Sequence, residues 1–199
     1  MNTTVIIDDL VRRGWSACED LLPVHSVLAL VNEATELWRD ERFTPAGIGR
    51  GQEFKIRPEI RSDHVWWWNV EELSPAQKTY WDAIEDLRRK LNEELFLNLR
   101  DFETHYAVYP PGSLYKKHVD QFQTASQRVI SCILYLNASW QKEDGGQLRI
   151  YDPETSESFT DVFPGAGTFT CFRSDTINHE VLPATRERFS LTGWLRRAA

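Results

Sequence analysis

Three residues in the second half of the sequence carry side chains that bind metal ions. His118 and Asp120 lie two positions apart in the run YKKHVD, and His179 follows much later in the chain. On a strand, residues i and i+2 point to the same face, so these two side chains can reach one point in space. Two imidazoles and one carboxylate leave the opposite face of a metal open, as non-haem iron(II) oxygenases require for co-substrate and O2. We therefore identify His118, Asp120 and His179 as candidate iron ligands.

A fourth residue, Arg188, suits a co-substrate with two carboxylates. It follows His179 on the next expected strand, where its guanidinium can hold a carboxylate through two parallel hydrogen bonds. A surface ion pair with Glu187 or another carboxylate is the alternative for Arg188, and a His-x-Asp pattern alone also occurs by chance. The remaining histidines, His25, His64 and His105, have no carboxylate two positions ahead on a strand, so we expect them to be ordinary core or surface residues.

The first hundred residues are expected to be mainly helical. Hydrophobic residues recur at helical spacing between Pro23 and Asp40. A second helix is expected to begin after Ser74, because Ser74 is a good N-cap, Pro75 suits the first turn and Gln77 completes a capping box. Its apolar stripe predicts a face packed against a sheet: Tyr80, Ile84, Leu87, Leu91 and Leu95.

From Phe102 onward, short strand-like runs alternate with turn signals such as Pro110-Pro111-Gly112 and Pro164-Gly165-Ala166-Gly167. Eight such runs predict a double-sheet jelly roll with the helices on the outer face of one sheet. The expected strands are Phe102–Tyr109, Leu114–His118, Arg128–Leu136, Gly146–Tyr151, Phe159–Val162, Thr168–Phe172, His179–Val181 and Phe189–Leu195.

The composition is that of a packed globular chain. Of the 199 residues, 41% are hydrophobic and 27% are charged, and the formal net charge is -7. Because nucleic-acid binding requires an excess of Lys and Arg at the phosphate contacts, we do not expect this acidic chain to bind nucleic acid. No apolar run approaches the length of a membrane span, and the N-terminal segment lacks the features of a signal peptide. Cys18, Cys132 and Cys171 form no Cys-x-x-Cys pair, so we expect a reduced, cytoplasmic protein without structural zinc.

The order of these motifs closely resembles that of the prolyl hydroxylases of the hypoxia-sensing type and their bacterial relatives. The resemblance is strong over residues 100–196 and looser before them, around Arg61-Ser62-Asp63 and the tryptophan run. The motifs are Tyr109-Pro110, Tyr115, His118-Val119-Asp120, Cys132-Ile133-Leu134-Tyr135-Leu136-Asn137, Gly145-Gly146-Gln147-Leu148-Arg149-Ile150, His179-Glu180-Val181, Arg188 and Thr192-Gly193-Trp194.

The resemblance implies an α+β protein with a double-stranded β-helix core of the cupin-like jelly-roll type. One oxygenase domain is expected over residues 1–199, with helical support and a substrate loop in 1–100 and the core in 101–199. The resemblance also implies an oxidoreductase, a dioxygenase that uses Fe(II), 2-oxoglutarate and O2, hydroxylates a prolyl residue of a protein and releases succinate and CO2. Ascorbate is included among the candidate cofactors.

Residue roles follow from the same resemblance. His118, Asp120 and His179 would bind iron, and Arg188 would hold the distal carboxylate of 2-oxoglutarate with a hydrogen bond from Tyr135. Ser190 departs from the animal enzymes, which have a small apolar residue there, and would add a hydroxyl to the same carboxylate. Tyr115 and Arg128 would lie on the substrate side. The residues expected to line the co-substrate pocket are Tyr109, Leu148, Thr192 and Trp194.

Two further segments are candidates for substrate binding. The segment Thr44–Ser62 contains three glycines and an excess of basic residues, and we expect it to be a mobile loop that covers a bound peptide, with a plain surface loop as the alternative. In the run Trp66-Trp67-Trp68, alternation on a strand places Trp66 and Trp68 on one face and Trp67 on the other. Trp66 is the candidate for the substrate groove, and packing in the core plus one interface residue is the alternative.

The iron motif leaves the substrate open. A lysyl residue or a small molecule can undergo the same chemistry, and a non-catalytic cupin-like binding module is a different class altogether. For a bacterial source, the resemblance points to a protein partner with an exposed prolyl loop, with elongation factor Tu as a candidate.

Overall fold

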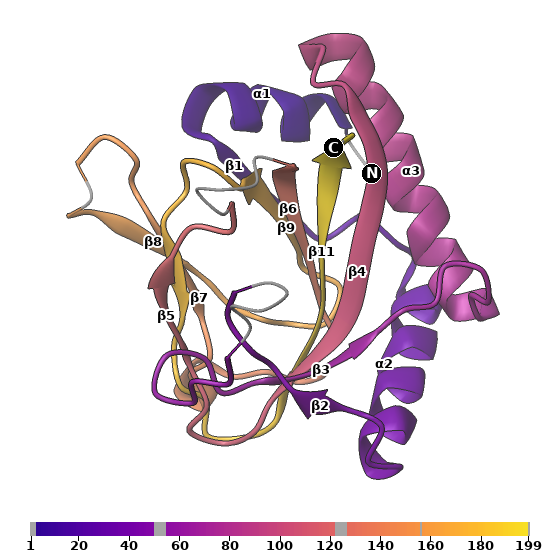
Figure 1. Ribbon diagram of the computed structural model, residues 1–199, viewed down its shortest axis with the longest axis vertical. Coiled ribbons are helices and arrows are strands. Elements are labelled where there is room, and N and C mark those ends of the chain that lie inside the picture. The colour runs from indigo at the N-terminus through magenta and orange to yellow at the C-terminus, as the bar shows by residue number, and fades with distance from the viewer. Residues whose placement is uncertain (1–2, 50–54, 122–126, 156, 199) are drawn as a thin grey trace.

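Two antiparallel sheets form the centre of the molecule (Figure 1). The computed structural model describes residues 3–49, 55–121, 127–155 and 157–198. The larger sheet has seven strands in the order β1-β9-β6-β11-β4-β3-β2, and the smaller has four in the order β5-β10-β7-β8. The strands are β1 (Trp15–Cys18), β2 (Thr44–Pro45), β3 (His64–Trp67), β4 (Leu99–Tyr109), β5 (Tyr115–His118), β6 (Arg128–Tyr135), β7 (Leu148–Tyr151), β8 (Phe159–Val162), β9 (Phe169–Arg173), β10 (His179–Val181) and β11 (Arg188–Arg197).

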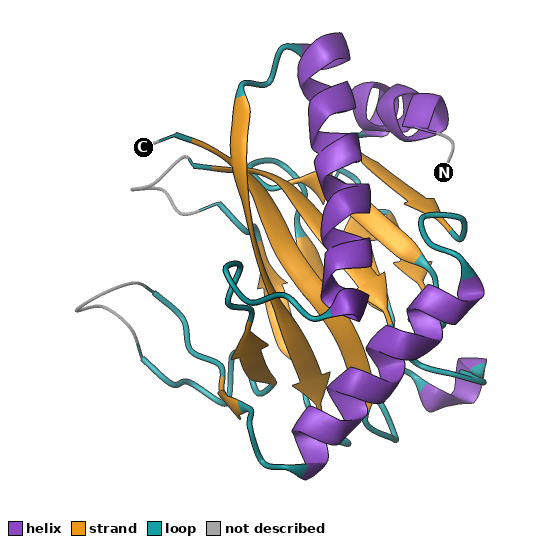
Figure 2. Cartoon of the chain, turned by 90° about the vertical axis from the view of Figure 1, so that its right-hand side faces the viewer, coloured by secondary structure: helices purple, strands orange, loops and turns teal. Residues whose placement is uncertain are grey.

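Three helices cover the outer face of the larger sheet (Figure 2). They are α1 (Thr3–Arg13), α2 (Val24–Arg39) and α3 (Pro75–Leu95). The predicted capping box is present, since the Ser74 hydroxyl accepts from the backbone of Gln77 and the Gln77 side chain accepts from the backbone of Ser74. The stripe of α3 is buried as expected, which fixes this helix against the sheet.

The alternation of β4 separates two hydrophobic cores. Tyr106 and Val108 point toward the helices and belong to the larger core. Ala107 and Tyr109 point between the two sheets and belong to the smaller one. Because side chains alternate across a sheet, the inner face of β4 and its neighbours is the only one that can reach the smaller sheet.

The expected α+β jelly roll is confirmed, and all eight expected strands are present. Seven of them lie within two residues of their predicted bounds, and β4 begins three residues earlier than expected. The helix α1 and the strands β1 and β2 were not predicted from the sequence, and β3 was anticipated only as the alternation of the tryptophan run, although these three strands extend the larger sheet at both edges. These strands have two to four residues each, too few to establish a period. Within the described ranges, no helix is long and apolar enough to cross a membrane.

Candidate active site

The two candidate metal-binding histidines face each other across paired strands. His118 ends β5 and His179 begins β10, and the two residues are directly opposite in the ladder. Asp120 lies in the loop after β5, so it reaches the histidines from beyond the strand end and not from the strand itself. Its Oδ1 is 3.4 Å from His118 Nε2 and 3.7 Å from His179 Nε2. Single ligand atoms of all three residues lie within 4.8 Å of one another, as a shared metal ion requires.

Neighbouring groups orient each of the three side chains. His118 Nδ1 is 2.6 Å from the carbonyl oxygen of Lys116, and His179 Nδ1 is 3.1 Å from that of Ile177. A carbonyl only accepts hydrogen bonds, so each Nδ1 carries the proton and each Nε2 keeps a free lone pair. His118 Nε2 is buried and has no hydrogen-bond partner in the described part of the chain, an orphaned position that suits a metal ligand.

The environment of the triad sets the protonation states of Asp120 and His179. Burial alone would raise the pKa of Asp120, but His179, His118 and the Ser131 hydroxyl together hold it well below its usual value. Burial and the neighbouring His118 lower the pKa of His179 to about 4. Near neutral pH, Asp120 is therefore a carboxylate and His179 a neutral imidazole, the forms in which these side chains bind a metal.

Arg188 occupies the opposite part of the same inner cavity. It is 1% exposed, and its Nε donates to the carbonyl oxygen of Gly146 over 2.7 Å. Its guanidinium carbon lies 5.0 Å from the ring centres of both Tyr109 and Tyr135. No ion pair joins Arg188 to a carboxylate of residues 3–49, 55–121, 127–155 or 157–198, whereas Glu187 accepts a hydrogen bond from Trp38 on the outside. The expected alternative, a surface ion pair, is therefore wrong for Arg188.

The hydroxyl of Tyr135 is buried without a hydrogen-bond partner among the described residues. Burial raises the pKa of Tyr135 to about 12, so this group stays protonated and can donate. A buried guanidinium without a carboxylate partner and a phenol without an acceptor, both judged among the described residues, are matched to one carboxylate. These residues fit the distal end of 2-oxoglutarate.

The inner cavity collects most of the predicted co-substrate residues. Ser190 is on the same inward face of β11 as Arg188, and its hydroxyl is 3.4 Å from that of Thr192. The described residues that line the cavity are Arg61, Asp63, His105, Ala107, Tyr109, Tyr115, His118, Asp120, Ile133, Leu148, His179, Val181, Arg188, Ser190, Thr192 and Trp194.

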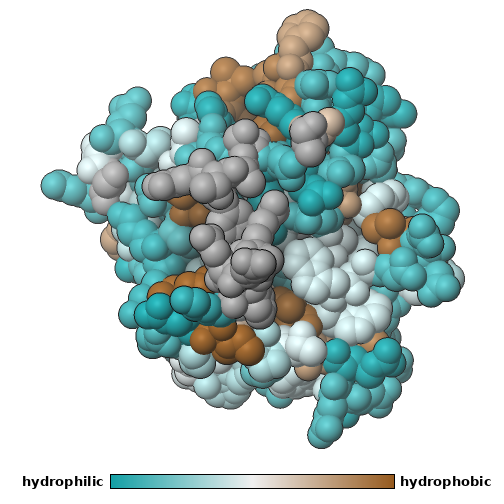
Figure 3. Space-filling model, in the orientation of Figure 1, coloured by the Kyte–Doolittle hydropathy of each residue, from teal (hydrophilic) through white to brown (hydrophobic). Residues whose placement is uncertain are grey.

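The cavity opens onto a groove of about 560 Å³. Four of the groove's lining residues, Arg61, Tyr115, Asp120 and Trp194, also line the cavity, so the groove leads to the candidate metal site. The predicted substrate residues Tyr115 and Arg128 both line it. Figure 3 shows separate hydrophobic patches within a mainly hydrophilic surface on the face seen in Figure 1.

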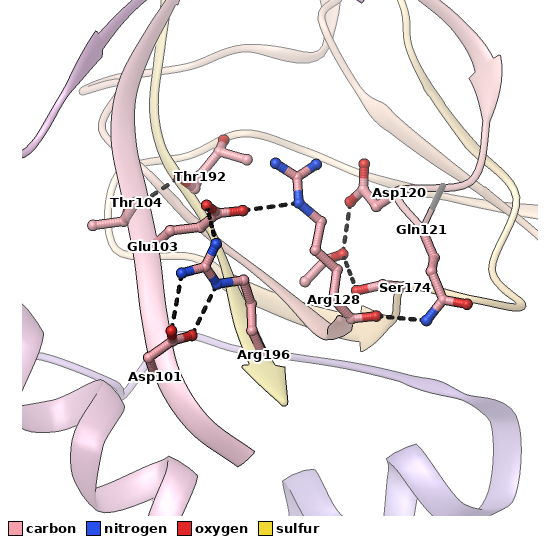
Figure 4. A network of polar contacts seen from close by, with 10 residues as sticks. Asp101, Glu103, Thr104, Asp120, Gln121, Arg128, Ser174, Thr192 and Arg196 are labelled. Carbon is pink, nitrogen blue, oxygen red and sulfur yellow. Dashed lines mark hydrogen bonds and ion pairs between the residues drawn. The ribbon is translucent and has the colours of Figure 1, made fainter. Parts of the chain in front are cut away.

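An ion-pair network supports one wall of this groove (Figure 4). Arg128 Nε donates to Glu103 over 2.9 Å, and its guanidinium lies 3.3 Å from the ring centre of Trp194. Arg196 bonds both Glu103 and Asp101. The wall is thus a set of paired charges that holds Trp194 in place, and it presents little net charge to a substrate.

The prediction for Trp66 is wrong. Trp66 stacks on Tyr106, with ring centres 6.2 Å apart, and packs into the core beneath the helices. Trp67 is the tryptophan that lines the groove, and it is 49% exposed. The alternation of the run was predicted, but which face turns inward depends on the register of β3 against β4, where Trp67 is opposite His105.

The segment Thr44–Ser62 borders the groove at both of its described ends. Residues 44–49 and Arg61 line the groove, and Ile48 pairs with Lys55 in an isolated bridge. Arg61 forms two hydrogen bonds with Asp63, of 2.7 and 2.9 Å. Residues 50–54, at the centre of the predicted loop, lie outside the described residues.

Sequence reasoning missed His105, which lines the inner cavity together with the candidate iron ligands. It is 1% exposed, and both ring nitrogens lack a hydrogen-bond partner in the part of the chain that the structure describes. The signal was available in the alternation of β4, because His105 shares the inward face with Tyr109.

The comparisons with known proteins agree with this geometry. Residues 104–196 match the family model described as the 2OG-Fe(II) oxygenase superfamily. The crystal structure of a Pseudomonas putida prolyl-4-hydroxylase matches this chain with a TM-score of 0.89 and 40% sequence identity. The match covers 98% of this chain and 99% of the Pseudomonas chain. The hypoxia-inducible factor prolyl hydroxylase of Caenorhabditis elegans is 30% identical over 203 residues, a match that covers 95% of this chain and 27% of that protein.

A prolyl hydroxylase of Trichoplax adhaerens, solved in complex with a hypoxia inducible factor oxygen degradation domain peptide fragment, has the same fold. Its TM-score is 0.87 at 22% identity, and the match covers 98% of this chain and 88% of that one. The chain spans about a quarter of the length of the curated Caenorhabditis protein. The chain therefore belongs to the 2OG-Fe(II) oxygenase superfamily, whose members require Fe(II), 2-oxoglutarate and O2, and it is homologous to the hypoxia-inducible factor prolyl hydroxylases.

Proposed function

We propose that this enzyme hydroxylates a prolyl residue of a protein substrate and converts 2-oxoglutarate to succinate and CO2. One observation carries the proposal: the candidate metal triad and the buried Arg188 line a single cavity that opens onto a groove. A binding module has no need of an open metal face and a dicarboxylate anchor in the same cavity, which argues against the non-catalytic alternative.

His118, Asp120 and His179 hold iron(II) in this proposal. When bound, the iron couples the oxidative decarboxylation of 2-oxoglutarate to hydroxylation of the substrate carbon. The protein supplies position and shielding. Ser131 and the carbonyl groups of Lys116 and Ile177 fix the ligand side chains.

Arg188, Tyr135 and Ser190 take the distal carboxylate of 2-oxoglutarate. Leu148, Thr192 and Trp194 form walls of the cavity. The low dielectric of the buried site strengthens the pairing of Arg188 with a carboxylate, and the surrounding apolar side chains exclude water from the reacting carbon.

A protein rather than a small molecule is the proposed substrate, because the cavity opens onto a groove of about 560 Å³ outside the candidate metal site. The relative with the highest identity given above carries the name prolyl-4-hydroxylase, and the Trichoplax enzyme is named for its complex with a peptide. We propose a partner with an exposed prolyl loop, elongation factor Tu being the candidate to test first for a bacterial source. The three cysteines are free thiols, which favours a reducing, cytoplasmic setting.

The test is a hydroxylation assay with iron(II), 2-oxoglutarate, ascorbate and an array of proline-containing peptides. Mass spectrometry should find one added oxygen on proline, with succinate formed in step. The variant His179→Ala should abolish both signals, and Arg188→Lys should retain iron binding but require far more 2-oxoglutarate. Hydroxylation at lysine, or turnover of a small molecule with no peptide product, would replace the prolyl assignment. A wild-type protein that binds metal but makes no succinate with any substrate would overturn the enzymatic proposal.

A further inference from the structure

His105 is a buried polar side chain with no hydrogen-bond partner among the described residues, and it lines a cavity that the proposed chemistry uses. Both Nδ1 and Nε2 are buried and form no hydrogen bond to the described residues. Leaving such a group unpaired costs about 1–3 kcal/mol, so a histidine here is a liability for stability alone. Burial, followed by the charges of Arg61 and Arg128, lowers the pKa of His105 well below its usual value despite the opposing charge of Asp120. The ring is a neutral imidazole, with one N–H to donate.

His105 lines the same cavity as the three candidate metal ligands. His105 is opposite Trp67 of β3 and opposite Thr192 of β11, and these three strands lie side by side (Figure 1). Its ring centre is 4.5 Å from that of Trp67 and 5.5 Å from that of Trp194. The indole N–H of Trp194 also lacks a partner in the described part of the chain. Two unused donors therefore meet at this end of the cavity.

The position of His105 along β4 determines which carboxylate of 2-oxoglutarate its side chain can contact. Arg188 is opposite Tyr109, which is on the same face of β4 as His105. Tyr109 lies four positions after His105 in the strand, so their Cα atoms are about 13 Å apart. The Arg188 side chain and a five-carbon diacid placed end to end would span such an interval, and the diacid's second carboxylate would then lie near His105 and Thr192.

We infer that His105 binds 2-oxoglutarate directly, by donating a ring N–H to the carboxylate next to the keto group. The inference rests on the proposed function, because it requires 2-oxoglutarate with its distal carboxylate at Arg188. His105 would supply a hydrogen-bond donor to this carboxylate in addition to the contacts made by the metal and by Arg188. The alternative is a purely structural histidine stacked between Trp67 and Trp194.

Binding to the manganese-loaded protein separates the two roles without turnover. Titration calorimetry would compare wild type with His105→Met, which fills the space without an N–H, and with His105→Gln, which keeps a donor. We expect 2-oxoglutarate to bind His105→Met at least tenfold more weakly, roughly the loss of one hydrogen bond to a charged group. His105→Gln should recover most of the affinity, and manganese affinity should be the same in all three proteins. Without 2-oxoglutarate, His105→Met should melt no lower than wild type, because it removes an unpaired buried group.

A truncated ligand identifies the end of the diacid involved. 2-Oxopentanoate keeps the keto acid and lacks the second carboxylate. The penalty of His105→Met should persist with this ligand, whereas Arg188→Lys should no longer matter. Equal binding of 2-oxoglutarate by His105→Met and wild type, or a penalty that vanishes with 2-oxopentanoate, would overturn the inference and leave the proposed function intact. A wild-type protein that binds manganese but not 2-oxoglutarate would overturn both.

Discussion

Ser131 holds one oxygen of Asp120 and leaves the other facing the two histidines. The Ser131 hydroxyl donates to Asp120 Oδ2 over 2.6 Å, whereas Oδ1 is the atom nearest to both Nε2 positions. Ser131 is fully buried in β6, and its hydroxyl is 2.8 Å from that of Ser174. Because Ser131 gives its only proton to the carboxylate, Ser174 must donate to Ser131. A chain of two hydroxyls thus fixes the only carboxylate of the triad from the larger sheet.

The variant Ser131→Ala should weaken metal binding by about 10- to 100-fold, the usual effect of removing a group that orients a ligand. Metal affinity would be measured by titrating manganese into the metal-free protein. Ser174→Ala is a graded control, because it removes an equally buried hydroxyl that reaches Asp120 only through Ser131 and should therefore cost less metal affinity. Equal losses in the two variants would show that Ser131 acts through packing and not through the carboxylate.

Gly146 should be needed for the position of Arg188. A Cβ at Gly146 would lie 3.1 Å from Arg188 Cδ and 3.0 Å from Ala184 Cβ, at a φ of +68°. We expect Gly146→Ala to weaken 2-oxoglutarate binding and to lower the melting temperature. Gly112→Ala is the matched control, since Gly112 has a φ of +80° but open space around its Cβ position. Both variants bear backbone strain of about 1 kcal/mol, and only Gly146→Ala should also lose affinity for 2-oxoglutarate. Similar affinities in both variants would contradict the proposed contact with Arg188.

The sequence predicted the residues whose positions follow from local rules. Ser74 and Gln77 form a capping box from neighbouring residues, and His118 carries its role in a short motif near Asp120. The roles of Trp67 and His105 depend instead on how β3 and β4 pair. A shift of one residue in that register would exchange Trp66 for Trp67 at the groove. Pairing between strands far apart in sequence is set by the whole core, so periodicity alone does not give it.

Acid should destabilise the metal-free protein before its carboxylates are protonated. His179 has a folded pKa of about 4 against an ordinary value of 6.5, and the pKa of His105 is lowered in the same direction. Between these values the unfolded chain binds a proton that the folded chain does not. The free energy of unfolding therefore falls as the pH drops from about 6.5 to 4, by up to about 3 kcal/mol for His179. Above pH 6.5 this loss is absent.

Urea unfolding of the chelator-treated protein at pH 7 and pH 5 would measure this loss. His179→Gln removes the titrating group, so its stability should change less over the same interval than that of the wild type. Parallel pH profiles for the two proteins would show that His179 titrates with the same pKa in the folded and unfolded chains, and would contradict the lowered pKa.

Substitutions of the neighbouring residues Trp66 and Trp67 should have different effects: the first on protein stability, the second on peptide binding. Trp66 packs beneath the helices against Tyr106, so Trp66→Ala should lower the free energy of unfolding by about 2 kcal/mol or more. Trp67 is 49% exposed at the groove, so Trp67→Ala should cost less stability. Instead it should raise the peptide KM by roughly tenfold, because exposed tryptophans in grooves supply much of the binding energy of a partner. The affinity for 2-oxoglutarate should change less than the peptide KM in Trp67→Ala. If Trp66→Ala, corrected for its unfolded fraction, raised the peptide KM more than Trp67→Ala, the groove would have been assigned to the wrong face of β3.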